Sequence, residues 1–219
     1  MTIKEAIVAR HSVRQYLDKA ISDEHVAQLN ALIEECNKES GLHIQLITGE
    51  PECFDTFLGH YGNFSNAVNY VAMIGSKSIA NLDETVGYYG ERIVLEAQCM
   101  GLNTCWVAGT YGKTKSKAAI GANEKIVCVI AIGYGANQGK EHRSKTMAKL
   151  CNVNPADMPD WFKEGVEAAM KAPTAINQQK FKIALDGDKA VITAGSGPMS
   201  KIDLGIVKYN FEAASGHKV

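Results

Sequence analysis

Residues 83–108 read DETVGYYGERIVLEAQCMGLNTCWVA, and the pattern changes from helix to strand at a glycine. Apolar residues recur at helical spacing over 83–100 and predict one long amphipathic helix. Gly101 supplies the stop, because glycine readily adopts the left-handed conformation that ends many helices. Residues 104–108 are then expected to form a strand. The sequence thus joins a long helix directly to a sheet.

The same apolar spacing predicts helices and strands on both sides of this unit. A short helix is expected over 2–10, with Thr2 as its cap before Glu5, and a longer one over 22–41 begins at a serine cap. The other expected elements are helices at 160–171 and 200–214, strands at 43–48, 70–75, 126–132, 181–185 and 190–193, and irregular segments at 50–66 and 133–145. The run IVCVIAI at 126–132 is typical of a central strand. Helices alternating with mixed strands imply an α+β sandwich with helices packed on a sheet.

Composition limits the class of protein. The chain has 219 residues, 46% of them apolar, which suits a single domain over 1–219. Its formal charge of −1 offers no basic excess for nucleic acid, so any phosphate must be held locally. No apolar run reaches the roughly 18 to 20 residues of a membrane span, and the charged N-terminus lacks the apolar core of a signal peptide. We expect a soluble cytoplasmic protein that acts on a small molecule.

Six cysteines lie far apart in the sequence, and no pair has the C-x-x-C spacing of a zinc or redox site. Most occur inside apolar stretches, as in the run CVIAI. We therefore expect reduced and mostly buried thiols, as is usual in cytosolic proteins, and no metal site.

A basic segment, Arg10-His11-Ser12-Val13-Arg14, follows the first helix directly. In an extended chain, alternate side chains point to one side, so Arg10, Ser12 and Arg14 are expected to face the same way. Two guanidinium forks and a hydroxyl suit one anion, and phosphate is the obvious one. The alternative is a solvated basic turn after a helix.

Residues 172–181, APTAINQQKF, form a loop between a predicted helix and a predicted strand. Pro173 ends the helix, and Thr174 offers a hydroxyl group. Asn177 and Gln179 offer side-chain amides, which both donate and accept hydrogen bonds. Such groups suit the edge of a heterocycle better than a metal ion. The alternative is an ordinary helix-capping turn.

A third segment, GLNTCWVAG at 101–109, passes from the helix stop into a strand. Trp106 could form the wall of a site for an aromatic ligand, although a tryptophan in a strand usually packs into the core. Cys105 could act as a nucleophile only beside a base, and no nearby histidine or aspartate supports that role.

The two ends of the chain resemble each other. A shift of 137 residues places 23–34 on 160–171 and the strand at 44–46 on 181–183, and shifts of 120 and 116 relate the later elements. We interpret this as an internal duplication, with halves at about 1–150 and 151–219. The alternative is coincidental repetition of a helix-strand unit.

Taken together, the three segments resemble the nitroreductase family of flavoproteins. That family opens with R-x-S-x-R after a short helix, matched by Arg10, Ser12 and Arg14. Its P-S-x-x-N-x-Q-P-W loop is matched at 173–181, with Thr, Lys and Phe in place of Ser, Pro and Trp. Its central helix running into G-L-G-x-x-W is similar to EAQCMGLNTCW. The run IAIGYG is similar to its I-x-x-G-Y-P, which precedes late basic residues.

The resemblance implies a nitroreductase-like fold, a three-layer α/β/α sandwich with a mixed, mainly antiparallel sheet. It also implies FMN as cofactor, NAD(P)H as reductant, and nitroaromatic or quinone-like acceptors, with the chemistry on the flavin and no side chain acting as acid or base. The residues expected to bind FMN are Arg10, His11, Ser12, Arg14, Arg143 and Lys145 at the phosphate and ribityl end, Pro173, Thr174, Asn177 and Gln179 along the ribityl chain and ring, and Cys105, Trp106, Val107, Ala108 and Gly109 near the reactive ring nitrogen.

One departure from the family is large. In ordinary members the P-S-x-x-N loop follows the first long helix, and a second subunit completes the FMN site. Here the loop follows the second helix copy instead, after residue 171. We hypothesise that the single chain mimics the family's dimer and binds one FMN without a partner, which leaves homodimerisation open.

Two alternatives to the reductase hypothesis remain at this stage. A flavin-binding or storage protein without turnover is favoured by the divergent loop, in which Lys180 and Phe181 replace Pro and Trp. An enzyme that consumes its flavin, as the related flavin destructases do, is the other. The sequence does not distinguish NADH from NADPH and does not name the electron acceptor.

Overall fold

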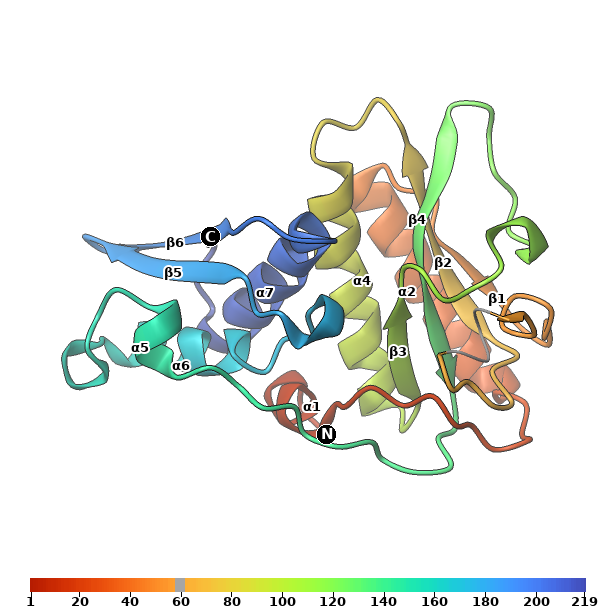
Figure 1. Ribbon diagram of the computed structural model, residues 1–219, viewed down its shortest axis with the longest axis horizontal. Helices are drawn as coiled ribbons and strands as arrows, with labels where there is room; N and C mark the ends of the chain where they lie inside the picture. Colours follow the sequence, from red (N-terminus) through yellow and green to blue (C-terminus); the bar gives the residue numbers. More distant parts are fainter. Residues whose placement is uncertain (58–61) are drawn as a thin grey trace. The chain divides into compact units, whose positions relative to one another are not determined.

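The computed structural model describes residues 1–57 and 62–219 and shows an α+β protein (Figure 1). The helices are α1 (Ile3–Ala9), α2 (Asp23–Ser40), α4 (Leu82–Cys99), α5 (Met147–Leu150), α6 (Asp160–Ala169) and α7 (Ser200–Ser215). The strands are β1 (Gln45–Ile47), β2 (Tyr70–Ser76), β3 (Asn103–Val107), β4 (Glu124–Gly133), β5 (Phe181–Asp186) and β6 (Lys189–Ala194). Short 3₁₀ helices occur at η1 (Lys113–Lys115), η2 (Pro155–Asp157) and η3 (Ala175–Asn177). Part of the irregular segment expected at 50–66, residues 58–61, lies outside the described residues.

The caps predicted from the sequence hold the ends of the first two helices. The Thr2 amide donates to Glu5 Oε2 over 2.7 Å, and Thr2 Oγ1 accepts from the Glu5 amide over 3.3 Å, which is a reciprocal capping box. Ser22 Oγ accepts from the His25 amide, and Gly41 ends α2 in the left-handed conformation with φ of 71°. The predicted helices and strands are confirmed in type, and their boundaries move by only a few residues.

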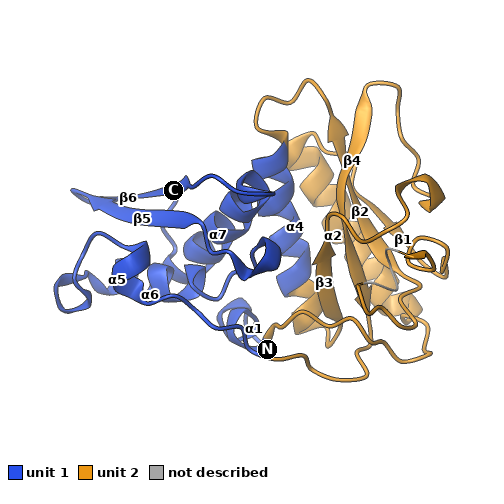
Figure 2. Cartoon of the chain, viewed as in Figure 1, with its two compact units in different colours: residues 1–9, 83–95, 141–219 blue, residues 10–82, 96–140 orange. Residues whose placement is uncertain are grey.

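The chain divides into two compact units, coloured separately in Figure 2. Unit 1 consists of Met1–Ala9, Asp83–Leu95 and Glu141–Val219, and unit 2 consists of Arg10–Leu82 and Glu96–Lys140. The units interleave along the sequence, so their limits differ from the expected halves that meet near residue 150.

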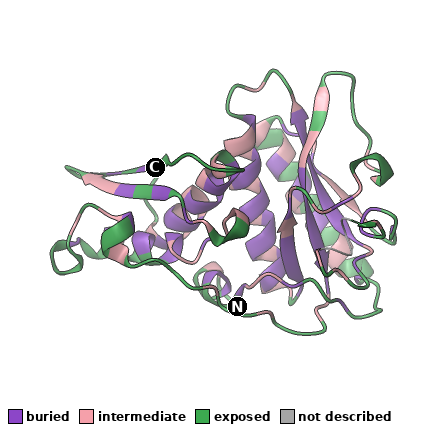
Figure 3. Ribbon diagram, viewed as in Figure 1, coloured by how far each residue is buried: buried purple, intermediate pink, exposed green. Residues whose placement is uncertain are grey.

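Unit 2 contains a four-stranded antiparallel sheet with the strand order β1-β2-β4-β3. The IVCVIAI run lies in β4, which pairs with β2 on one side and β3 on the other, so the predicted central strand is confirmed. The inner strands are buried (Figure 3), and Ile130 and Tyr70 are fully enclosed. Parallel pairing among the described residues is confined to isolated bridges such as Ser12–Thr104. The sheet is therefore antiparallel, with parallel contacts only at its margins.

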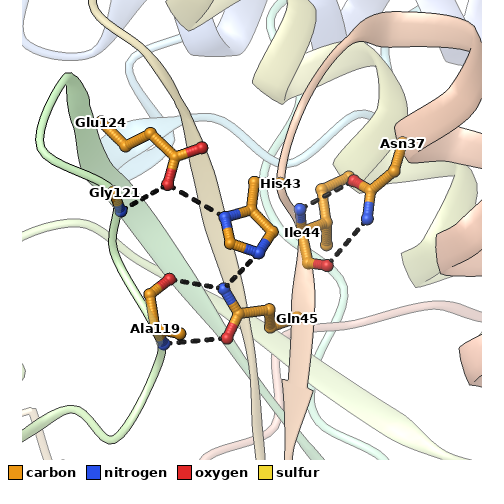
Figure 4. Close-up of polar contacts among 7 residues, drawn as sticks. All are labelled: Asn37, His43, Ile44, Gln45, Ala119, Gly121 and Glu124. Carbon is orange, nitrogen blue, oxygen red and sulfur yellow. Dashed lines mark hydrogen bonds and ion pairs between the residues drawn. The ribbon is translucent and has the colours of Figure 1, made fainter.

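β1 is shorter than the strand expected over 43–48, and a side chain of α2 bonds the backbone of Ile44 just before it (Figure 4). The Ile44 amide donates to Asn37 Oδ1 over 2.7 Å, and Asn37 Nδ2 donates to the Ile44 carbonyl over 2.9 Å. Asn37 thus satisfies both backbone groups of Ile44, while the His43 amide still donates to the Ile74 carbonyl over 2.9 Å, ahead of the ladder that begins at Gln45.

Polar side chains at the start of β1 also fasten the loop that precedes β4 (Figure 4). Gln45 Nε2 donates to the Ala119 carbonyl over 2.7 Å, and Gln45 Oε1 accepts from the Ala119 amide over 2.9 Å. Glu124 Oε2 lies 2.9 Å from His43 Nδ1 and accepts from the Gly121 amide over 2.7 Å. The contact with His43 has the larger effect on the Glu124 carboxyl, and the contact with Gly121 adds to it. Together they hold the pKa of this carboxyl below its usual value.

In unit 1, α6 packs against α7, and β6 of the β5–β6 hairpin contacts α7 (Figure 1). The rings of Phe162 and Phe211 meet edge to face with centroids 5.9 Å apart, and Trp161 lies 6.3 Å from Phe211. A β carbon on Gly165 would lie 2.5 Å from the Phe211 ring. The absence of a side chain at Gly165 therefore makes room for the aromatic core of this unit.

The part of α4 in unit 1 approaches α7 backbone to backbone. A β carbon on Gly87 would lie 2.0 Å from the Ile202 carbonyl oxygen, and one on Gly205 would lie 2.0 Å from the Glu84 carbonyl oxygen. Both distances are far inside van der Waals contact, so glycine is required at both positions.

A helix-strand-strand-helix order occurs twice, as α2-β1-β2-α4 and as α6-β5-β6-α7, and both strand pairs are antiparallel. The shifts of 137 and 120 residues do not reproduce the strand register, however. They would carry the pair Leu46–Val71 onto Ile183–Val191, whereas Ile183 pairs with Ile192. Internal duplication stays a prediction, and its alignment is displaced by one residue in this hairpin.

No helix in the described part of the chain combines the length and the apolar character needed to cross a bilayer.

Candidate functional site

The basic segment that follows α1 is extended and held on both sides within unit 2. On one side, Ser12 bridges Thr104 at the start of β3, and the Val13 amide donates to the Thr104 carbonyl over 3.0 Å. On the other side, the Leu17 amide donates to the Tyr134 carbonyl over 2.8 Å. Residues 10–17 therefore form an extended, strand-like segment between β3 and the chain that follows β4. This segment is called the basic ribbon below.

A glycine allows the chain after β4 to approach this ribbon closely. Gly139 has φ of 72°, and a β carbon there would lie 2.8 Å from His11 Cβ and 2.9 Å from the Ser12 carbonyl oxygen. Asn103 supports the same chain, because its Oδ1 accepts from the Gly135 amide over 3.0 Å. Sequence reasoning missed both Gly139 and Asn103, and only the turn-like GYGANQG composition marked this region.

Three groups of the segment at 10–14 influence the Cys105 thiol. Burial raises the pKa of this thiol, and the Arg14 charge, a hydrogen bond with Ser12 and the Arg10 charge oppose that rise. Arg10 is buried with 4% exposure, whereas Arg14 is exposed. Both guanidinium groups and the hydroxyl thus act on one thiol, whose raised pKa leaves it uncharged at neutral pH, and their common role in binding an anion stays a prediction.

The residues at the end of β3 differ in their exposure to solvent. Cys105 and Val107 are buried, Trp106 and Ala108 are half-buried, and Gly109 is exposed. A buried thiol with a raised pKa is a poor nucleophile, which agrees with the low expectation for Cys105. Cys36, Cys53 and Cys128 are buried as well, and all six cysteines are free thiols.

The second cluster lies in unit 1, where the loop at 172–181 meets the segment around Arg143. Gln179 is buried, and its Nε2 donates to the Arg143 carbonyl over 2.8 Å and to Asn177 Oδ1 over 2.7 Å. Gln179 Oε1 accepts from the Lys145 amide over 2.7 Å, and Lys145 Nζ donates to the Gln179 carbonyl over 2.8 Å. The residues expected from two distant parts of the sequence are thus joined by direct hydrogen bonds.

The buried carboxylate of Asp203, on α7, holds this loop through two hydrogen bonds. Asp203 Oδ1 accepts from the Ala175 amide over 2.9 Å, and Asp203 Oδ2 accepts from Gln178 Nε2 over 2.7 Å. Burial raises the pKa of Asp203, and the two hydrogen bonds oppose that effect. Sequence reasoning missed Asp203, since nothing local indicates that a helix carboxylate contacts a loop 28 residues away.

The loop backbone is strained. Ile176, Asn177 and Gln179 have φ of 48°, 54° and 45°, in the left-handed region that few side chains adopt. Ile176 is 88% exposed, so packing of its side chain does not account for the conformation. Thr174 Oγ1 accepts from the Gln179 amide over 3.0 Å and helps to hold the turn. Such strain is often found at functional sites, which marks this loop as a candidate.

The expected site residues therefore form two clusters. Unit 2 carries Arg10, His11, Ser12, Arg14, Cys105, Trp106, Val107, Ala108 and Gly109, and unit 1 carries Arg143, Lys145, Pro173, Thr174, Asn177 and Gln179. Among the residues that the structure describes, no group of histidine, cysteine, aspartate and glutamate could hold a metal ion.

Three solved structures are similar to this chain in fold and distant from it in sequence. A "putative nitroreductase" from Thermotoga maritima MSB8 has 20% identity and a TM-score of 0.70, covering 98% of this chain and 83% of the other. A "putative nitroreductase in complex with FMN" from Desulfovibrio desulfuricans has 20% identity and a TM-score of 0.54, covering 70% and 96%. A "putative NADH oxidase" from Clostridium acetobutylicum has 18% identity and a TM-score of 0.52, covering 66% and 96%. At these identities the likeness shows the nitroreductase fold.

A search of curated proteins found no match. The model of the family described as "Putative TM nitroreductase" matches residues 2–215, nearly the whole chain. The protein therefore belongs to this nitroreductase family, as the resemblance of its three segments predicts.

Proposed function

We propose that the protein is an FMN-dependent oxidoreductase that uses NAD(P)H to reduce nitroaromatic or quinone-like acceptors. The extended segment at 10–14 carries the proposal, because its two guanidinium groups and its Ser12 hydroxyl all lower the pKa of the Cys105 thiol and so lie within its electrostatic range. Membership of the nitroreductase family supports it. So does the Desulfovibrio desulfuricans relative described in complex with FMN.

The donor set fits the phosphate of FMN. A phosphate monoester carries close to two negative charges at neutral pH, and guanidinium groups bind it through paired hydrogen bonds. Arg10 and Arg14 supply two such groups, and Ser12 supplies a hydroxyl donor. Because burial keeps Cys105 protonated, the thiol adds no negative charge that would compete with the phosphate.

The residues of unit 1 divide into two roles in this proposal. Gln179 uses both ends of its amide inside the loop, so we assign it to positioning rather than to binding. Asn177 Nδ2 donates to the Arg143 carbonyl over 3.0 Å and its Oδ1 accepts from Gln179, but its side chain is exposed, and an amide nitrogen and oxygen each have a second hydrogen-bonding position. The half-buried Thr174 hydroxyl accepts from the Gln179 amide and retains its own proton as a donor. We assign these remaining positions to the flavin ring or ribityl chain. FMN, when bound, supplies the hydride chemistry, and this chain binds it, orients it and leaves one face open to the nicotinamide and the acceptor.

Titration of the apoprotein with FMN, followed by flavin fluorescence, tests the binding role. Arg14→Ala removes a charge-assisted contact and is expected to weaken FMN binding by about 10- to 100-fold. Lys38→Ala is the matched control, because Lys38 is an exposed cation in the last turn of α2 and no predicted site residue lies on that helix. Equal FMN affinity in both variants would remove Arg14 from the site, and a protein that cannot be reconstituted with FMN would overturn the proposal.

The stoichiometry and the fate of the flavin complete the test. We propose one FMN per chain, so Arg14→Ala and Asn177→Ala should weaken one and the same binding event. Two flavins per chain would contradict this. Anaerobic bleaching of the flavin by NADH or NADPH supports a reductase. No bleaching indicates storage, and loss of flavin absorbance under oxygen and reductant indicates a flavin-consuming enzyme.

A further inference from the structure

Unit 1 contains a cavity of about 740 Å³ that no role in flavin binding explains. Its walls come from α1, α6 and the segment that leads into α5. Apolar side chains dominate the lining, among them Ile7 and Val8 from α1, Met147 from α5, and Ala168 and Met170 from α6 and its end. The volume lies within the roughly 300–1,000 Å³ of sites that bind small organic molecules.

The charged residues of the cavity have a negative balance. Lys4 Nζ pairs with Glu164 Oε2 over 2.8 Å, and Lys171 pairs with Glu141, so four of these charges cancel. Glu167 is the fifth charged lining residue, exposed on α6, one helical turn from Glu164. A cation that enters the cavity is therefore favoured over an anion.

Hydrogen bonds hold the segment at 142–145, which lies between the cavity and the loop at 172–181. His142 Nε2 lies 3.1 Å from the Met170 carbonyl oxygen, and Ser144 Oγ donates to the same oxygen over 3.3 Å. His142 and Ser144 line the cavity, whereas Arg143 and Lys145 do not. The backbone and side chain of Lys145 are instead bonded to the loop at 172–181. Within unit 1 the segment thus lies between the cavity and the loop at 172–181.

We propose that this cavity binds a small organic amine with an apolar body, independently of FMN. The apolar body lies against Ile7, Met147 and Ala168, where it removes apolar surface from water. The ammonium group lies at the rim and pairs with the Glu167 carboxylate. The two ion pairs keep the other charged side chains of the rim in place.

A matched series of three probes tests the proposal by titration calorimetry on the full-length protein. 4-Phenylbutan-1-amine, 4-phenylbutan-1-ol and 4-phenylbutanoate share one apolar body and differ in charge. We expect the amine to bind about tenfold more tightly than the carboxylate, with the alcohol between them. Glu167→Gln should remove most of the advantage of the amine and leave the alcohol unchanged. Glu34→Gln, an exposed carboxylate of α2, controls for net charge.

A second variant tests the location. Val8 is 61% exposed on α1, so Val8→Trp can enter the mouth of the cavity without disturbing the core, and it should abolish binding of all three probes. No binding by wild type, tightest binding of the carboxylate, or unchanged binding in Val8→Trp would each overturn the proposal. Displacement of FMN by the amine would also overturn it. The probe titrations do not need FMN, so failure of the proposed function leaves this test intact.

Discussion

Replacing Ile176 by glycine should stabilise the protein, although most single substitutions destabilise a fold. Ile176 has φ of 48° and ψ of 25°, a left-handed conformation in which a β-branched side chain is strained. Its side chain is 88% exposed, so the substitution removes almost no packing. Relief of backbone strain is then the main effect on the folded state.

The magnitude follows from two opposing contributions. Strain at a non-glycine left-handed residue costs about 1–3 kcal/mol. The extra conformational freedom of glycine in the unfolded chain costs about 0.5–1 kcal/mol. The difference between the midpoints of these ranges predicts a gain of roughly 1 kcal/mol in the free energy of unfolding. For a chain of this length, that gain corresponds to a rise in Tm of roughly 2–4 °C.

Thermal unfolding followed by circular dichroism, together with urea denaturation, measures the effect. Ile176→Val retains the β-branch and should leave Tm within about 1 °C of wild type. Ile176→Asn should raise Tm, because asparagine tolerates the left-handed region. A glycine variant that melts at or below the wild-type temperature, with the valine variant unchanged, would refute the assignment of strain to this residue.

Three further predictions concern other parts of the fold. Gly205→Ala should lower the free energy of unfolding by about 2 kcal/mol or more, because its β carbon would lie 2.0 Å from a backbone oxygen. Gly195→Ala, whose β carbon would have its nearest neighbour at 3.4 Å, should not lower it. Urea denaturation of both variants can check this. Because the pKa of Glu124 is lower in the folded protein than its unfolded value of 4.5, the Glu124 carboxylate stabilises the fold fully at pH values above 4.5. This stabilisation is lost as the pH falls through the pKa of the folded protein. Glu124→Gln should therefore flatten the pH dependence of stability below about pH 5, as denaturation at several pH values can show. Alkylation at pH 8, followed by peptide mass spectrometry, should modify the half-buried Cys151 well before the buried Cys105, whose raised pKa disfavours the thiolate.

Local patterns in the sequence were sufficient for most elements. The serine cap of α2, the stop at Gly101 and the apolar run of β4 each act within a few residues of the chain, so they can be read without tertiary structure. The alternation of Arg10, Ser12 and Arg14 is also a local pattern, and the extended backbone that it requires is present, whereas a common side for the three side chains stays a prediction.

Contacts between distant residues could not be read in this way. Asp203 supports a loop 28 residues earlier, and Asn37 satisfies both backbone groups of Ile44 from a neighbouring helix. Gly139 is needed because its φ is 72° and because the basic ribbon passes within contact distance of it. Each of these depends on how the chain packs, and neither residue type nor spacing indicates it.

The backbone hydrogen bonds of the basic ribbon affect how an anion would bind there. The amides of Val13, Tyr16 and Leu17 already donate to the carbonyls of Thr104, Ser65 and Tyr134. A preorganised segment loses its conformational entropy during folding and not during association. Phosphate binding at this ribbon should therefore cause little change in backbone amide exchange over residues 13–17, and its kinetics should show a single bimolecular phase without a slower ordering step.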